Sequence, residues 1–213
     1  MESSAAADAF ITELRQGLIE TCERLVPVRA GFVKAACEAT LGTTPRAPLE
    51  GAAWAARVTG AALAVHTERG EAAEEIVRFL AVEEVDAHQL ILCHMDKRPD
   101  FGLHRELAQA GVLLEYDTFQ RPKYDPEANL WPLIERMAAA GLDDAVALAT
   151  DMADPALWAY GGGPGPASLP GSIRARLQAI GLPPETITGM LGYNVATRLA
   201  VPAETLSDQE TER

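Results

Sequence analysis

The sequence has 213 residues, of which 48% are hydrophobic, and a formal net charge of −13. This length suffices for one domain with a sizeable core, and the acidic balance excludes the basic surface of a protein that binds nucleic acid or anionic membranes. No segment reaches the roughly 20 apolar residues of a membrane span, no secretory signal is recognisable, and the three cysteines give no disulfide framework, so we expect a cytoplasmic protein.

Short apolar segments alternate along the chain with longer amphipathic segments. The expected strands are residues 31–36, 62–67, 90–95, 112–118 and 145–151. The expected helices are residues 8–24, 49–60, 70–84, 101–110, 127–140, 170–180 and 184–199. This alternation is typical of an α/β protein with a parallel sheet, and the nearly continuous apolar character of the strands predicts that both faces are covered.

The organisation predicted from these elements is a single domain over residues 1–204, followed by a disordered, charged tail over residues 205–213. A stretch rich in glycine and proline, residues 160–171, follows the last expected strand. Loops of this kind often shape or cover a functional site.

Polar side chains recur at or near the carboxyl ends of the expected strands: Lys34, His66, His94, Asp117 and Asp151. Because parallel strands end at the same edge, we expect these side chains to gather at one face. Each has an ordinary interpretation, since a histidine can be buried for packing and an aspartate can cap a helix. Their coincidence favours a metal site, because two imidazoles and carboxylates suit a zinc-type ion.

Lys34 needs a separate explanation, because a lysine in a buried strand is costly unless it is paired or neutral. A neutral lysine amine can react with CO₂ to give a carbamate. Such an anionic group could bridge two metal ions.

The sequence resembles the phosphotriesterase family of the amidohydrolase superfamily. The resemblance covers residues 8–200 and rests on "VRAGFVKAA" (28–36), "AVHTERG" (64–70), "LCHMD" (92–96), "LEYDTF" (114–119), "LATDMA" (148–153) and the ending "GMLGYNVATRLA" (189–200). The stretch "YDTFQRPKYDPE" points to the phosphotriesterase-homology branch. The resemblance implies a partial TIM (β/α)₈-type barrel with five strands, equivalent to strands four to eight of the family.

The resemblance also implies roles for individual residues and two divalent metal ions, expected to be zinc. Lys34 would be the carboxylated bridging ligand, and His66 and His94 would bind the more exposed ion. Asp151 would bind the more buried ion and act as the catalytic base. The remaining residues would support the ligands (Asp96, Asp117) or contact a small-molecule substrate (Arg121, Lys123, Tyr124).

The sequence departs from the family in lacking a His-x-His pair, so the more buried metal site is expected to be incomplete. The two other histidines, His88 and His104, are expected to be structural or exposed. Strands one to three have no counterpart either. We favour a fragment of a longer gene product over two further explanations, a homodimer of complementary chains and a partial barrel without full activity.

The function implied is that of a metal-dependent hydrolase, in which metal-bound hydroxide attacks a phosphoester or a lactone or ester bond. Two alternatives remain open. One is a lyase that forms a Schiff base through Lys34, and the other is a catalytically incomplete fragment or pseudoenzyme.

Overall fold

The structure, a computed structural model, describes residues 2–21 and 23–200. The predicted tail, residues 205–213, lies outside the described residues, and so does Cys22. Within the described part, no helix is both long and apolar enough to cross a membrane.

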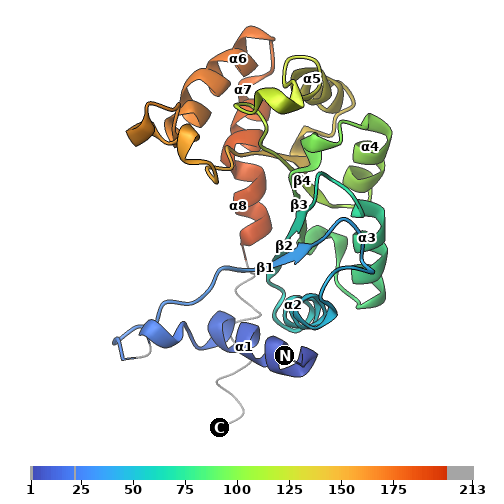
Figure 1. The fold of residues 1–213 in the computed structure, drawn as a ribbon, viewed down its shortest axis with the longest axis vertical. Helices are drawn as coiled ribbons and strands as arrows, with labels where there is room; N and C mark the ends of the chain where they lie inside the picture. The colour runs from blue at the N-terminus through green and yellow to red at the C-terminus, as the bar shows by residue number, and fades with distance from the viewer. Residues whose placement is uncertain (1, 22, 201–213) are drawn as a thin grey trace. The chain divides into compact units, whose positions relative to one another are not determined.

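Five parallel strands form one sheet in the order in which they occur in the chain (Figure 1). They are β1 (Phe32–Cys37), β2 (Ala62–Thr67), β3 (Leu90–Cys93), β4 (Leu113–Tyr116) and β5 (Val146–Leu148). The predicted α/β class and the five strands are therefore confirmed.

Helices follow or precede each strand (Figure 1). They are α1 (Ser3–Arg15), α2 (Arg46–Thr59), α3 (Ala73–Val82), α4 (Phe101–Gln109), α5 (Leu130–Ala139), α6 (Arg174–Ala179), α7 (Pro184–Thr188) and α8 (Asn194–Leu199). Short 3₁₀ turns lie between several of these elements, including Met95–Lys97 after β3 and Pro122–Tyr124 after β4.

Three predicted helices differ from the observed ones in backbone conformation. The predicted helix over 170–180 begins within a π-helical segment, Leu169–Ile173, that precedes α6. The predicted helix over 8–24 ends at Arg15, because Gly17 adopts φ +116°, which a continuing helix does not allow. The predicted helix over 184–199 is divided into α7 and α8 by a π-helical segment, in which Gly192 has non-helical φ and ψ angles.

The chain divides into two compact units. The first contains residues up to 68, residues 72–91 and residues from 198 onwards, and the second contains residues 69–71 and 92–197. The predicted single domain over residues 1–204 stays a prediction.

In the first unit, β1 pairs in parallel with β2, with Ala36 opposite His66. Exposed and buried residues alternate along β1, so one face of this strand is open among the described residues. The prediction of strands covered on both faces is therefore wrong for β1. Phe32 lies on this open face and is 43% exposed.

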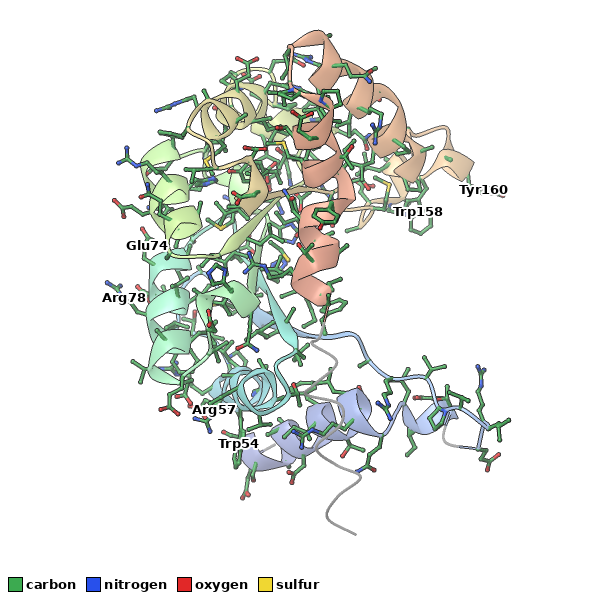
Figure 2. The ribbon with its side chains drawn as sticks, turned by 180° about the vertical axis from the view of Figure 1, so that it is seen from behind. Trp54, Arg57, Glu74, Arg78, Trp158 and Tyr160 are labelled. Carbon is green, nitrogen blue, oxygen red and sulfur yellow. The ribbon has the colours of Figure 1, made fainter. Side chains whose placement is uncertain are left out.

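The first unit also contains a close contact between helices α1 and α2. The buried residues Ala6 and Ala7 of α1 lie against Gly51 of α2. A Cβ atom on Gly51 would lie 2.6 Å from the Cβ of Ala6, so only glycine fits there. On the outer side of α2, the labels in Figure 2 mark Trp54 and Arg57, and Arg57 pairs with Glu84 at 2.9 Å.

The second unit has its own apolar core around β4 and α5. Leu113, Leu114, Leu130 and Ile134 are fully buried there. The loop after β5 extends away from this core and exposes Trp158 and Tyr160 (Figure 2). The core therefore positions the ends of β3, β4 and β5 rather than the tip of that loop.

Candidate functional site

The buried side chain of His94 contacts Asp117 in the second unit. His94 directly follows β3 with φ 66°, in the left-handed region, and Asp117 directly follows β4. Nδ1 of His94 contacts Oδ2 of Asp117, and both residues are buried. Because a carboxylate only accepts hydrogen bonds, Nδ1–H donates, and the lone pair of the imidazole is then on Nε2, as metal coordination requires.

Asp96 fixes the backbone that follows β4. Its Oδ2 accepts hydrogen bonds from the backbone N–H groups of Asp117 (3.0 Å) and Thr118 (2.7 Å) and from the hydroxyl of Thr118 (2.6 Å). Burial and the nearby charge of Asp117 raise the pKa of Asp96 to about 7, although the three hydrogen bonds act in the opposite direction. Asp96 thus connects the turn after β3 with the end of β4.

A third acidic residue, Glu115, lies beside His94 and Asp117. The three side chains each offer a ligand atom, and these atoms lie within 4.8 Å of one another. One imidazole and two carboxylates form a donor set that zinc and similar divalent ions accept. The residues present therefore fit a bound divalent ion.

Arg121 and Asp151 form a second polar contact in the same unit. Nη2 of Arg121 donates to Oδ2 and to the backbone oxygen of Asp151, at 2.6 Å in each case. Asp151 lies three residues beyond the end of β5, with φ 37°, a conformation that few residues other than glycine adopt. Arg121 therefore holds both the side chain and the backbone of the residue predicted to be the base.

Tyr124 and Lys123, both predicted to contact substrate, lie on the 3₁₀ turn after β4. Nζ of Lys97 is 5.7 Å from the centre of the Tyr124 ring, and Nζ of Lys123 is 4.9 Å from it. Two ammonium groups thus lie near one partly exposed aromatic ring.

Lys34 and His66 belong to the first unit. Lys34 is the third of six residues in β1, at an exposed position, so the expectation of a buried lysine is wrong. Because Ala36 is opposite His66, Lys34 lies two residues earlier on the same face, and strand geometry places its Cα roughly 8 Å from that of His66. Nε2 of His66 also lies 3.9 Å from Glu68.

The second unit thus brings His94, Asp96 and Asp117 together and joins Arg121 to Asp151, while Lys34 and His66 share a face of the first unit. Asp151 is not part of the cluster formed by His94, Glu115 and Asp117. Convergence of all four predicted metal ligands stays a prediction. Sequence analysis missed Glu115, although its spacing of two from Asp117 in an apolar strand indicates the same face.

His104 is structural, as expected. It is fully buried; Nε2–H donates to the backbone oxygen of Arg98 at 2.9 Å, and Nδ1 accepts from the hydroxyl of Tyr116 at 2.7 Å. Burial lowers the pKa of His104 to about 4. His88, by contrast, is exposed at the amino end of β3.

Residues 1–197 match the model of the Phosphotriesterase family. The chain therefore belongs to the phosphotriesterase family, and the resemblance found in the sequence is confirmed.

Individual relatives are also similar to this chain. A phospho-furanose lactonase from Mycoplasmopsis synoviae is 29% identical over 127 residues, which are 58% of this chain and 35% of the relative. The match thus spans about a third of the length of that curated relative.

Solved structures show the same fold at lower identity. The phosphotriesterase homology protein from Escherichia coli, solved with phosphate in its active site, has a TM-score of 0.81 and 20% identity, with 94% of this chain and 68% of that chain covered. A lactonase from Listeria monocytogenes has a TM-score of 0.81 and 22% identity, with 95% and 62% covered. An amidohydrolase from Mycoplasma synoviae has a TM-score of 0.82 and 23% identity, with 98% and 64% covered.

Proposed function

We propose that this chain functions as a metal-dependent hydrolase that acts on a lactone or a phosphoester. The observation that supports the proposal most directly is the buried contact of His94 with Asp117, because it keeps an imidazole in the tautomer that can bind a metal ion. Membership of the phosphotriesterase family and similarity to a phospho-furanose lactonase support the substrate class.

The metal ligands that we propose are those predicted from the sequence: Lys34, His66, His94 and Asp151. A bound divalent ion would polarise the scissile bond and lower the pKa of a water molecule. Asp117 keeps the His94 ring in one orientation, and Asp96 fixes the backbone on which Asp117 lies.

Asp151 accepts the proton of the attacking water in this proposal. Only an ionised carboxylate can accept a proton, and the guanidinium of Arg121 pairs with the ionised form. We therefore assign Arg121 to orienting Asp151. Lys123 and Tyr124 remain the residues proposed to contact substrate, and the two ammonium groups near Tyr124 would suit a substrate with a phosphate substituent.

The test is a hydrolysis assay with added Zn²⁺ or Mn²⁺ on a phosphotriester, simple lactones and a phosphorylated lactone. We expect turnover of at least one substrate, a loss of a hundredfold or more in His94→Ala, and no loss in the matched variant His88→Ala, which removes an exposed histidine. Metal content should fall in His94→Ala as well. Equal activity of the two variants would contradict the proposal.

The two alternatives from the sequence predict different results. A Schiff-base lyase would be trapped on Lys34 by borohydride in the presence of a carbonyl substrate, but the exposed position of Lys34 does not supply the desolvation that this chemistry uses. A catalytically incomplete chain would be folded and turn over no substrate with any metal.

A further inference from the structure

A loop of the first unit exposes a concentration of apolar side chains. It follows α1, comprises residues 18–21 and 23–28 of the described chain, and projects beyond the end of that helix (Figure 1). Four of the eleven large hydrophobic side chains that are exposed in the described part lie in this loop: Ile19, Leu25, Val26 and Val28. Apolar side chains gathered in this way mark a surface that another molecule covers.

We propose that this apolar loop, residues 18–21 and 23–28, joins two copies of the chain in a symmetric dimer, with the tip of each loop in a groove of the other copy. A twofold axis would relate the two copies, so the same residues of each would form both halves of the interface. This dimer surface belongs to the first unit and does not involve the residues of the proposed hydrolase site.

Hydrogen bonds hold the apolar loop together at its base. The backbone N–H of Leu18 donates to the backbone oxygen of Val28 at 2.8 Å. The buried hydroxyl of Thr21 donates to the backbone oxygen of Leu18 at 2.9 Å and accepts the backbone N–H of Val28 at 3.0 Å. These contacts fix the base and leave Leu25 and Val26 projecting at the tip. A second copy would therefore bind a preformed surface, and little conformational entropy would be lost.

A groove beside the apolar loop has the size and character to accept the tip of another loop. Its volume is about 610 Å³, within the range of about 300–1,000 Å³ of sites that bind small molecules. Its lining comes from one face of α1 and from the loop, and includes Asp8, Ala9, Thr12, Glu13, Ile19 and Pro27. The side chains of Leu25 and Val26 from a second copy would bury apolar surface against Ala9 and Ile19 there.

Charge complementarity favours a second copy as the occupant of the groove. Asp8 and Glu13 line the groove, whereas Arg24 precedes Leu25 at the tip of the loop. None of these three charged side chains forms an ion pair among the described residues. In a symmetric dimer, Arg24 of each copy would lie beside the two carboxylates of the other. Because the net charge of −13 makes two copies repel each other, association needs such a local attraction.

The projecting tip and the groove lie next to each other on the same chain. A twofold dimer requires this arrangement, because each copy must offer both halves of the contact. A different partner would account for the exposed apolar tip but not for the acidic groove beside it.

The experiment compares self-association of the full chain and of two variants by sedimentation velocity, from low to high micromolar concentration. Leu25→Asp places a carboxylate at the tip, where a dimer would bury it beside Asp8 and Glu13. Val82→Asp is the matched control, because Val82 is 79% exposed at the end of α3 and both variants have the same net charge. We expect wild type and Val82→Asp to dimerise alike, and the dimer dissociation constant to rise tenfold or more in Leu25→Asp.

A charge exchange tests the orientation of the two copies. Arg24→Asp should weaken dimerisation, because the new carboxylate would meet the acidic groove of the other copy. Adding Asp8→Arg to the same chain should restore a large part of the lost affinity, since opposite charges then meet again with their positions exchanged. Adding Glu106→Arg instead changes the net charge equally at an exposed position of α4 and should restore none of it.

A folding defect is recognised by a separate measurement. At the lowest concentration, wild type and all variants should have the same circular dichroism spectrum and the same melting temperature. At higher concentration the melting temperature should rise for wild type and Val82→Asp but not for Leu25→Asp, because dimerisation stabilises only the folded state.

Three results would overturn the proposed dimer. A wild type that stays monomeric at every concentration would exclude a second copy as the occupant. Dimers of equal stability in Leu25→Asp and wild type would mean that the copies meet at another surface, such as the open face of β1. A charge exchange that restores no affinity would contradict the placement of the tip in the groove. All three are read without any substrate, so they are independent of the proposed hydrolase.

Discussion

Arg121 holds Asp151 at two points, its carboxylate and its backbone oxygen, with both hydrogen bonds 2.6 Å long. The two residues are separated by 30 positions in the sequence and come from the loops after β4 and β5. The contact thus fixes the residue proposed as the base to a neighbouring loop. The side chains of Arg121 and Asp151 are 15% and 21% exposed, so water screens this pair less than an ion pair on the surface.

Replacing Arg121 by lysine should destabilise the protein. A lysine keeps the charge but lacks the planar guanidinium that makes both contacts, and loss of a charged hydrogen bond in a partly buried site costs about 1–3 kcal/mol. The free energy of unfolding in urea measures this. Arg57→Lys is the control: its partner Glu84 is exposed, and we expect a change within about 0.5 kcal/mol. Equal losses in the two variants would contradict the prediction.

Replacing Thr118 by valine tests whether the hydrogen bonds to Asp96 stabilise the backbone after β4, on which Asp117 lies. Valine has nearly the same shape but lacks the hydroxyl that donates to Asp96 at 2.6 Å, so we expect a loss of about 1–3 kcal/mol in unfolding free energy. Thr188→Val removes a hydroxyl that donates to Pro184 within an exposed helix and should have little effect. If both variants unfold at the same urea concentration as wild type, the hydroxyl of Thr118 contributes nothing to the site.

Protonation of His104 should make the fold sensitive to acid. Its pKa is about 4 in the folded protein and near 6.5 in an unfolded chain, so the unfolded state takes up the proton first as the pH falls. The contribution of neutral His104 to the free energy of unfolding is therefore fully present above pH 6.5. It declines between pH 6.5 and about 4, by about 3 kcal/mol in total.

The measurement for His104 is the slope of unfolding free energy against pH over that range. His104→Gln removes the titrating group, so this variant should take up about one proton fewer than wild type when it unfolds. Its unfolding free energy should therefore depend less steeply on pH. His88→Gln alters an exposed histidine and should leave the slope as in wild type. A His104→Gln slope that matches wild type would show that His104 is not the group responsible.

Asn194 joins helix α8 to the beginning of β5. Its Nδ2 donates to the backbone oxygens of Asp143 and Val146, at 2.8 Å each. Asn194→Asp turns this donor into an acceptor facing two carbonyls, so we expect a loss of about 3 kcal/mol in unfolding free energy. Asn129→Asp is the control, because it loses only one such hydrogen bond, from Nδ2 to the backbone oxygen of Tyr124 in a partly buried environment. Its loss of unfolding free energy should be smaller. A larger loss of unfolding free energy in Asn129→Asp than in Asn194→Asp would contradict this role of Asn194.

The order and type of the elements could be predicted because apolar segments and amphipathic segments alternate clearly. Residues 62–67 match β2 at both ends. Residues 112–118 and 145–151 are longer than β4 and β5, because the predicted strands also include the polar residues 117–118 and 150–151, which lie beyond the observed strand ends. The sequence does not show which face of β1 is open, because Phe32 and Ala36 lie on the exposed face although both are apolar.

Part of the candidate site could be predicted from position alone. His94 and Asp117 follow two neighbouring strands, and the structure places their side chains in contact. The contact of Arg121 with Asp151 could not be predicted, since it depends on the turn after β4 and on the left-handed backbone of Asp151. Glu115 was overlooked because a single acidic residue in a strand usually indicates a solvent-facing position.

The contact of α1 with Gly51 limits how this part of the protein can evolve. Because α1 approaches α2 at Gly51, where Ala6 and Ala7 lie opposite, a larger side chain at Gly51 would force the two helices apart. Substitutions there are restricted by volume rather than by polarity or charge. Divergent homologues should therefore keep the smallest side chains at these positions while the outer surfaces of both helices vary freely.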